Sequence, residues 1–476
     1  MRRVVVAIGN RACGVFQRVA PDPFVIAVLL TLLTAGLAII VGYRGEGLDI
    51  GERAIRTLES WGGIGTPGMW SLLAFSMQMC LVLVTGHALA ESRPVARVLQ
   101  HLADVPRSGS FGAAMIAACA CGAAIVNWGL GLIVGAILAR EVGRSLARRG
   151  IGLSYPVLAA SGYTGMMVWH GGMSGSAPLG VTTVENAAKS LPPEVLETHG
   201  PAAGPWIGLE QTLWSPMNLV ITGGLLVIVP LVMWLLSPVD GARGELPAGI
   251  AAMEAEPESP RGVSSEWMGV TEWLERSPWI AWTLAGLCGL ALARFASASG
   301  GLSSIGLNEI NLAMLALGLA CHGSVRSYVS ASEDGARGCA GIILQFPLYA
   351  GIMAMMQQSG LGRAISESMI AVADDRSMPV LSFIAAAVLN MFVPSGGGQW
   401  AVQGPIVIEA AAGTGAPLGK AVMSVAYGDQ ITNMLQPFWA LPLLAITRVK
   451  AKDIIGYLAC VMTVGGVWIA TMLYIL

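Results

Sequence analysis

Eleven apolar segments follow one another along this chain, and most of them are close to the length of a membrane span. They lie near residues 23–42, 68–90, 110–138, 153–180, 212–236, 279–296, 305–324, 338–358, 378–411, 417–446 and 454–476. A helix needs about 20 apolar residues to cross the hydrocarbon core of a bilayer. Charged residues make up only 12% of the chain, against about 25% in soluble proteins. We therefore predict an all-α polytopic protein that crosses the lipid bilayer several times.

The charge and the cysteines exclude several classes of partner. The formal net charge is −2 and the isoelectric point is about 6.2, which offers no basic surface to nucleic acid. The eight cysteines form no CxxC pair and mostly lie within apolar runs. A thiol in such a run is a small hydrophobic group. We therefore expect no nucleic acid, no disulfide framework and no cofactor other than a coupling ion.

The segment at 110–138 has the wrong length for a whole number of spans. Arginines flank it on both sides: Arg93, Arg97, Arg107, Arg140, Arg144, Arg148 and Arg149. Positive charges in short loops mark the cytoplasmic side, so both ends face the same way. Two full crossings would need about 40 residues. We predict a re-entrant helical hairpin that turns at "VNWGLG", residues 126–131.

A second segment of odd length, 378–411, repeats this pattern around "VPSGGG" at 393–398. In the predicted register Gly129 and Gly131 correspond to Gly396 and Gly398, and Tyr163 corresponds to Tyr427. An amphipathic arm precedes each hairpin. The order span, span, arm, hairpin, broken span, span therefore occurs twice. We predict two repeats, at 1–237 and 305–476, with about nine full spans and two hairpins in all.

The region between the repeats decides their relative orientation. Residues 238–278 form a linker rich in Pro, Gly, Ala and Glu, with too little apolar surface to fold alone. Residues 279–304 supply one connecting span. Because the number of connecting spans is odd, the second repeat has the opposite orientation in the membrane, as in many secondary transporters. We expect the N-terminus and the linker in the cytoplasm and the C-terminus in the periplasm.

Hairpin tips and broken helices expose free N–H and C=O groups, which can form a polar cage at membrane depth. Helix N-termini there suit a small anion. For His170 the alternative to substrate binding is a hydrogen bond to a carbonyl oxygen that the helix break leaves free. For Trp128 and Trp400 the alternative is plain packing. Valine in place of Gly397 is expected to block the site. We expect substrate at Asn127, Trp128, Gly129, His170, Ser174, Ser395, Gly396, Gly397, Gly398, Gln399 and Trp400.

Asp429 is the predicted site of a coupling cation. No Lys or Arg lies in the predicted tips or in the stretches 161–179 and 426–444 around the predicted helix breaks, and carboxylates within the membrane are costly and usually functional. Na⁺ would suit the oxygens of Asp429, Thr432 and Asn433, whereas H⁺ needs only Asp429. The alternative is a buried acceptor that caps a broken helix.

Three stretches resemble the bacterial short-chain fatty acid transporter family. They are "GIILQFPLYAGIMAMM" at 341–356, "FVPSGGGQWAVQGP" at 392–405 and "YGDQITNMLQPFWALPLL" at 427–444. The resemblance implies an inner-membrane carrier for monocarboxylates such as acetoacetate, butyrate and acetate. The related ion-transporter superfamily has scaffold and transport domains and holds carboxylates between two hairpin tips. Its dicarboxylate carriers have Ser-Asn-Thr tips, whereas this chain has Asn127-Trp128-Gly129 and Pro394-Ser395-Gly396.

We therefore predict secondary active uptake of short-chain fatty acids by alternating access, coupled to H⁺ or Na⁺. One alternative is a carrier for another small organic anion, such as a dicarboxylate, and another is a passive channel. An intramembrane enzyme would have to use Ser174 or Ser395 with His170, and no nucleophile motif supports it. We expect a transporter and not an enzyme. Small residues on the packing faces permit a homodimer.

Overall fold

The computed structural model describes residues 2–19, 21–188, 191, 195–197, 206–238, 246–247, 250, 269–298 and 307–476. Within these ranges the regular elements are helices, with no strand. Residues 239–245, 248–249 and 251–268 of the predicted linker at 238–278 and residues 299–304 of the predicted connecting span lie outside the described residues, and the described end of the linker contains the helix α14 (Val270–Arg276). In this part of the chain, seven helices are long and apolar enough to cross a membrane: Pro23–Val41, Gly68–Glu91, Gly109–Val126, Pro216–Leu236, Pro278–Ser297, Val325–Gln358 and Ala451–Ile475.

The prediction of an all-α, multi-pass membrane protein is thereby confirmed at this coarse level. The predicted count of about nine full spans is not reproduced, because several helices are short or charged. Leu307–His322, Ser377–Asn390 and Pro437–Thr447 are apolar but have fewer than 18 residues. The helix Trp128–Arg148 carries Arg and Glu along its second half.

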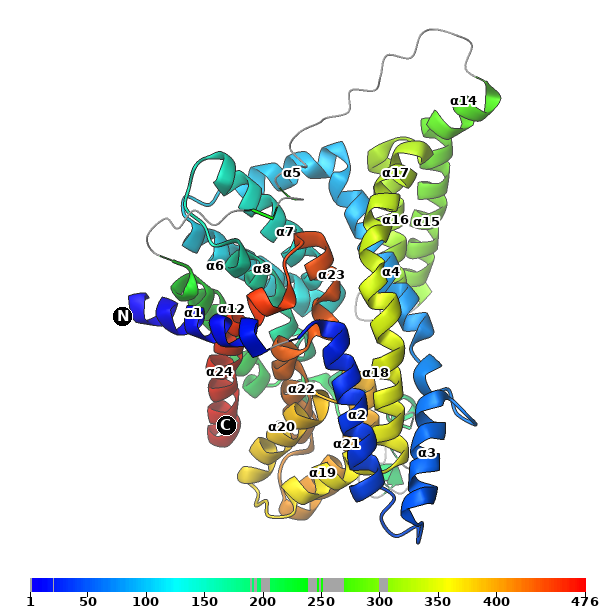
Figure 1. Ribbon diagram of the computed structural model, residues 1–476, viewed down its shortest axis with the longest axis vertical. Helices are drawn as coiled ribbons and strands as arrows, with labels where there is room; N and C mark the ends of the chain where they lie inside the picture. The colour runs from blue at the N-terminus through cyan, green and yellow to red at the C-terminus, as the bar shows by residue number, and fades with distance from the viewer. Residues whose placement is uncertain are drawn as a thin grey trace.

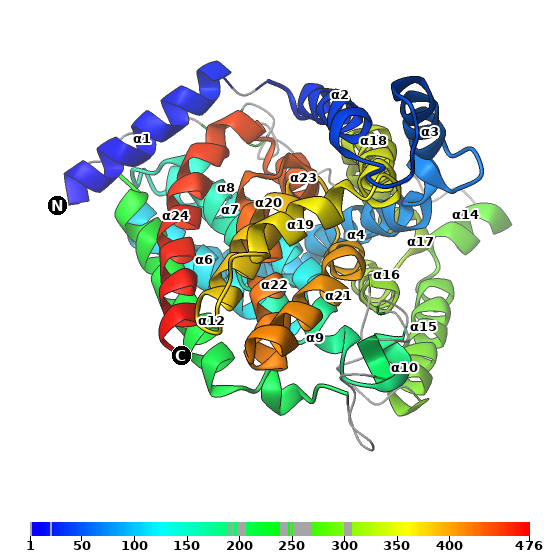
Figure 2. The same ribbon diagram turned by 90° about the horizontal axis from the view of Figure 1, so that it is seen from below.

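The helices form two groups that lie side by side, as Figures 1 and 2 show. The first helix group comprises α2 (Pro23–Val41), α3 (Ile50–Gly62), α4 (Leu73–Glu91), α15 (Pro278–Ala298), α16 (Leu307–His322), α17 (Val325–Ala336) and α18 (Ala340–Gln358). The second helix group comprises α1 (Arg2–Val19), α6 (Gly109–Val126), α7 (Trp128–Arg148), α8 (Tyr155–Tyr163), α9 (Ser176–Gly180), α12 (Pro216–Leu236), α20 (Ser377–Asn390), α21 (Gly396–Thr414), α22 (Leu418–Thr432), α23 (Pro437–Thr447) and α24 (Ala451–Ile475).

Two short helices connect the groups. The helix α5 (Arg93–Asp104) leads from α4 to α6, and α19 (Leu361–Ile370) leads from α18 to α20. They lie at opposite ends of the long axis of the molecule, α5 near the top of Figure 1 and α19 near the bottom. On α5 the apolar Val98 and Leu102 are exposed, while Asp104 accepts a hydrogen bond from Ser145 of α7 at 2.5 Å. One side of this arm is therefore fixed to the second group, and the other suits a membrane interface.

The order of helices is the same in two parts of the chain. The series α4 to α9 and α12 matches α18 to α24 in the order of its elements, although α8 and α9 are shorter than α22 and α23. In the first series, α8 passes into two 3₁₀ turns, η2 (Thr164–Met167) and η3 (Trp169–Gly171), before α9. In the second, α22 passes into η8 (Asn433–Leu435) before α23. Both interruptions lie in the apolar segments where the sequence predicted broken helices.

Glycines allow the backbones of the second group to touch. A Cβ atom at Gly135 of α7 would lie 2.0 Å from the carbonyl oxygen of Gly162 in α8. Similarly, a Cβ atom at Gly428 of α22 would lie 2.3 Å from the carbonyl oxygen of Phe383 in α20. Because lipid provides little hydrophobic drive for association, such small-residue contacts hold membrane helices together. They fix α7, α8, α20 and α22 around the two interruptions.

The N-terminal helix α1 was not predicted as an element. It lies across the ends of α12 and α24 (Figure 1). Cys13 donates through its thiol to the carbonyl oxygen of Asp453 at 3.1 Å, and Tyr457 donates to Asn10 at 2.9 Å. Burial raises the pKa of the Cys13 thiol to about 11, so the thiol stays protonated and can donate. The guanidinium of Arg2 lies 4.4 Å from the ring centroid of Trp234, which adds a cation–π contact.

Candidate functional site

The first turn of interest joins α6 to α7 through the single residue Asn127. Its side-chain oxygen accepts from the backbone N–H groups of Gly129 at 2.9 Å and Leu130 at 3.4 Å, so it caps the start of α7. The backbone N–H of Trp128 donates to Ser174 at 3.0 Å. The turn predicted at 126–131 therefore narrows to Asn127, and it is hydrogen-bonded to the interrupted segment that follows α8.

The second turn lies between Asn390, the end of α20, and Gly396, the start of α21. The hydroxyl of Ser395 accepts from the N–H of Gly398 at 3.2 Å and caps α21. The three glycines thus form the first turn of a helix and not the loop itself. As helix caps, Ser395 and Asn127 therefore occupy equivalent positions in the two turns. The correspondence predicted from the glycines differs from this one by one residue.

His170 and Asp429 meet at the centre of the second helix group. His170 belongs to η3 and Asp429 to α22, and they are 0% and 2% exposed. The Nδ1 atom of His170 lies 3.1 Å from Oδ1 of Asp429. The backbone N–H of His170 also donates to the side-chain oxygen of Gln430 at 3.1 Å. Two residues that the sequence assigned to different roles are therefore direct partners.

The hydrogen bonds determine which nitrogen of His170 carries a proton. The backbone N–H of Ala177 lies 3.1 Å from Nε2 of His170, and a backbone N–H can only donate. Nε2 is therefore unprotonated, and the neutral ring carries its proton on Nδ1, which donates to Asp429. The other carboxylate oxygen of Asp429, Oδ2, is buried and has no hydrogen-bond partner among the described residues. This oxygen can accept a proton or a cation without displacing His170.

The first turn of α21 rests on this pair. A Cβ atom added to Gly396 would lie 2.9 Å from both Cε1 of His170 and Cη2 of Trp169. The rings of Trp169 and His170 stack with centroids 4.2 Å apart and an interplanar angle of 17°. At Gly397 an added Cβ would meet no atom within 4 Å. Close packing at this turn therefore belongs to Gly396, and Gly397 faces open space.

Asn390 organises the second interruption. Its side-chain nitrogen lies 2.6 Å from the carbonyl oxygen of Asp429, 3.0 Å from the hydroxyl of Thr432 and 3.1 Å from the side-chain oxygen of Asn433. Gln436 donates to the carbonyl oxygen of Asn390. The side-chain oxygens of Thr432 and Asn433, predicted as cation ligands, thus accept from the amide of Asn390, which contacts the backbone carbonyl of Asp429 and not its carboxylate. The side-chain oxygens of Asn390 and Gln436, like Oδ2 of Asp429, are buried with no partner in the described ranges.

Two tyrosines link the interruptions. The hydroxyl of Tyr163, at the end of α8, donates to the carbonyl oxygens of Asn433 at 2.9 Å and Gln436 at 3.2 Å. The hydroxyl of Tyr427 in α22 donates to Asn218 at 2.8 Å, and Asn218 in turn donates to the carbonyl oxygen of Gly171 at 3.0 Å. Each tyrosine therefore satisfies backbone groups that belong to the other interruption, either directly or through one residue.

Replacing Tyr163 by phenylalanine should destabilise the protein by about 1–3 kcal/mol, because two buried carbonyl oxygens lose a hydrogen bond and that of Asn433 keeps only the N–H of Gln436. The measurement is the thermal unfolding midpoint of the purified protein in detergent. Tyr474→Phe is the matched control, since Tyr474 is 56% exposed at the end of α24. Equal midpoints for the two variants would contradict this assignment.

The remaining predicted residues lie around the pair or away from it. Trp128 packs against Trp169 and Trp439, with ring centroids 6.3 Å and 5.0 Å apart. Gln399 instead donates to the carbonyl oxygen of Ala386 at 2.9 Å within its own helix pair. Trp400 is 1% exposed and buried beside Gly404. Sequence reasoning missed Asn390, Gln430 and Gln436, although each is an amide beside a helix break in an apolar segment.

Comparison with known proteins decides the family. The model of the family described as short chain fatty acid transporter matches residues 4–476. The chain belongs to this family. A member from Escherichia coli strain K12, provisionally named a short-chain fatty acid transporter, is 40% identical over 454 residues, or 95% of each chain. One from Haemophilus influenzae, with the same name, is 37% identical over 437 residues, or 92% of each chain.

The resemblance to this family that the sequence predicted is therefore confirmed. Membership of the family indicates a transport protein rather than an enzyme. Solved structures are similar only distantly. The Alcanivorax borkumensis YdaH transporter is 14% identical, with a TM-score of 0.42 over 96% of this chain and 98% of that one. Neisseria gonorrhoeae MtrF, whose structure is described as illuminating a class of antimetabolite efflux pumps, is also 14% identical, with a TM-score of 0.42 over 100% of this chain and 97% of MtrF. Similarity this low does not inform the site.

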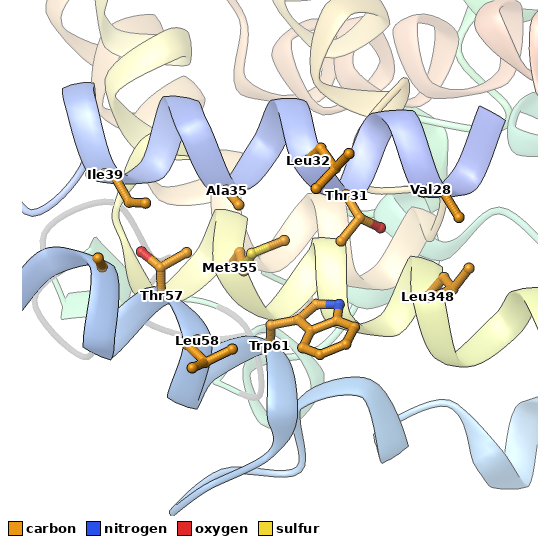
Figure 3. Close-up of a pocket in the computed structure, with 11 residues that line it drawn as sticks. Val28, Thr31, Leu32, Ala35, Ile39, Thr57, Leu58, Trp61, Leu348 and Met355 are labelled. Atoms are coloured by element: carbon orange, nitrogen blue, oxygen red, sulfur yellow. The ribbon is translucent and has the colours of Figure 1, made fainter. Parts of the chain in front are cut away.

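This short-chain fatty acid transporter family member also has an apolar groove on its first helix group. The groove has a volume of about 480 Å³ and lies between α2, α3 and α18 (Figure 3). Leu32 and Leu58 on its rim are more than 60% exposed, and Thr31 and Thr57 are the polar side chains that line it. The groove offers no charge or amide to a carboxylate, so we place no substrate there.

Proposed function

We propose that this protein takes up short-chain fatty acids, such as acetoacetate, butyrate and acetate, by secondary active transport coupled to H⁺ or Na⁺. The observation that carries the proposal is the buried pair of His170 and Asp429, which joins the two helix interruptions beneath the first turn of α21. A carboxylate buried so deeply in an apolar protein is energetically costly, and such groups usually have a function. Family membership supports the substrate class.

Two features support alternating access. The repeated order of helices and the arms at opposite ends of the molecule favour two inverted repeats, 1–237 and 305–476, separated by the linker 238–278 and the span 279–304. On this basis α6–α7 and α20–α21 are re-entrant hairpins. The first helix group serves as scaffold and the second as the transport domain, in a bacterial inner membrane with the N-terminus in the cytoplasm.

Charge provides the coupling. A carboxylate substrate near the first turn of α21 would be repelled by Asp429, since like charges about 4 Å apart interact by about 4 kcal/mol in a protein environment. A cation bound at Oδ2 of Asp429 removes this repulsion. For H⁺, Asp429 alone suffices. For Na⁺, the side-chain oxygens of Asn390 and Gln436, which have no other partner in the described residues, supply further ligands.

Uptake of labelled butyrate into proteoliposomes, with H⁺ and Na⁺ gradients imposed one at a time, tests the proposal. We expect concentrative uptake with one gradient and only equilibration without any. Acetate and acetoacetate should compete with butyrate, and a dicarboxylate such as succinate should compete poorly. The proposal fails if neither gradient drives accumulation.

A further inference from the structure

A second set of charged side chains surrounds a cavity of about 560 Å³ at the boundary between the two helix groups. The first group contributes α4, α17, the 3₁₀ turn η7 (Arg337–Cys339) and α18, and the second contributes α7 and α23. In this region α4 packs against α17 and also against α7 and α23. The polar side chains that line the cavity are His87, Arg140, Asp334, Arg337 and Arg448.

Among the side chains that line the cavity positive charges outnumber negative ones, and two carboxylates behind them, Glu91 beside His87 and Glu141 beside Arg140, offset part of this charge. Three arginines line it against one aspartate, Asp334, which pairs with Arg337 at 3.2 Å. Arg140 is only 3% exposed, and its Nε donates to Glu141 at 2.9 Å. Glu141 also pairs with Arg144 at 3.3 Å, so its single charge is shared between two arginines.

Arg140 and Arg448 still have hydrogen-bonding capacity. In the described part of the chain, Nε is the atom of Arg140 that pairs, which leaves both terminal amino groups for another acceptor. Arg448 caps the end of α23 in a left-handed backbone conformation, with φ of 54°. Its guanidinium has no hydrogen bond or ion pair among the described residues. His87 lies against a carboxylate of its own helix, with its Nε2 3.0 Å from Glu91.

We propose that this cavity is a second binding site for a short-chain carboxylate. A guanidinium matches a carboxylate with two parallel hydrogen bonds, and such bonds strengthen where water is scarce. Arg140 and Arg448 hold the carboxylate, while Leu441 and Ala445 on the same wall receive a short alkyl chain. The identity of the anion rests on the proposed function, and the site itself rests on the charge and shape of the cavity.

This site is separate from the pair of His170 and Asp429. α7 runs from Asn127, at the first turn, to Arg140, a distance of about 20 Å at 1.5 Å per residue. α23 runs from the second interruption to Arg448, about 16 Å by the same rule. The cavity therefore lies beside the second half of α7 and the C-terminal end of α23, away from the turn and the interruption where these two helices begin. A positive cavity in this place concentrates anions beside the transport path.

Chemical modification of arginine tests the site without depending on transport. Full-length protein in detergent is treated with phenylglyoxal, with or without butyrate, and the modified arginines are quantified by mass spectrometry. We expect butyrate to reduce modification of the exposed Arg448 several-fold. Butyramide, the neutral isostere, should not protect it. Arg376, at the start of α20 and far along the chain from the cavity, is the internal control and should react equally in all samples.

Arg140→Gln should raise the butyrate concentration that protects Arg448 by about tenfold or more, the loss expected for a charged bidentate contact. Arg144→Gln, which removes the other partner of Glu141 without altering the cavity lining, should not. Unchanged modification of Arg448 with butyrate overturns the proposal, as does equal protection of Arg376. Protection in a protein that does not transport would sink the proposed function alone, and transport without protection would sink only this site.

Discussion

Asp429→Asn should abolish concentrative uptake and leave the fold intact. Asparagine keeps an oxygen that can accept from Nδ1 of His170, now 3.1 Å from Oδ1 of Asp429, so the packing of the pair is preserved. The substitution removes the charge that holds the cation, an interaction of about 3 kcal/mol or more inside a protein. Ion-driven accumulation of butyrate should therefore fall at least about a hundredfold.

The measurement compares accumulation under an imposed ion gradient with exchange of butyrate at equal concentrations on both sides. Exchange should persist in Asp429→Asn, because the cation is no longer needed to balance a charge at that position. Asp374→Asn is the matched control. Ser377 hydrogen bonds hold the pKa of the exposed Asp374 carboxyl below its usual range, and asparagine caps a helix about as well as aspartate. Full accumulation in Asp429→Asn would refute the coupling role.

Local features of this site could be predicted from sequence because they depend on neighbours along the chain. Segment lengths and helix-breaking residues predicted turns within 126–131 and 393–398 and an interruption in the segment that contains His170, and the turns at Asn127 and before Gly396 lie within these ranges. The carboxylate of Asp429 was conspicuous because charge is rare in an apolar segment. Each of these signals comes from one continuous segment of the chain.

Contacts between distant segments could not be predicted in the same way. His170 and Asp429 are 259 positions apart, and their partnership depends on how α22 packs against η3. The side chain of Gln399 points toward Ala386 and not toward the buried pair. Because a helix rotates about 100° per residue, an error of one residue in the predicted register moves a side chain to another face of the helix. The sequence does not distinguish the three consecutive glycines, so it could not show which of them packs against His170. Asn390 was overlooked because its bonds reach Asp429, Thr432 and Asn433, all about forty positions later.

Gly396→Val should eliminate transport. A Cβ atom there would lie 2.9 Å from the rings of His170 and Trp169 and 3.1 Å from the hydroxyl of Ser176. These rings are buried and stacked, and His170 is held by Asp429 and Ala177, so they cannot move without losing the pair. Overpacking of this kind costs about 1–3 kcal/mol. We expect loss of both ion-driven uptake and exchange, because α21 can no longer close on His170.

Gly397→Val provides the comparison that separates steric conflict from general damage to the turn. The next residue along has open space around its Cβ position, and both variants lose the same glycine flexibility in the first turn of α21. Gly397→Val should fold normally and keep at least its exchange activity, unlike Gly396→Val. If Gly397→Val is as inactive as Gly396→Val, then the open space beside Gly397 is itself occupied during transport, and the substrate contacts the turn there. If Gly396→Val transports normally, the first turn of α21 does not close on His170, and the site lies elsewhere.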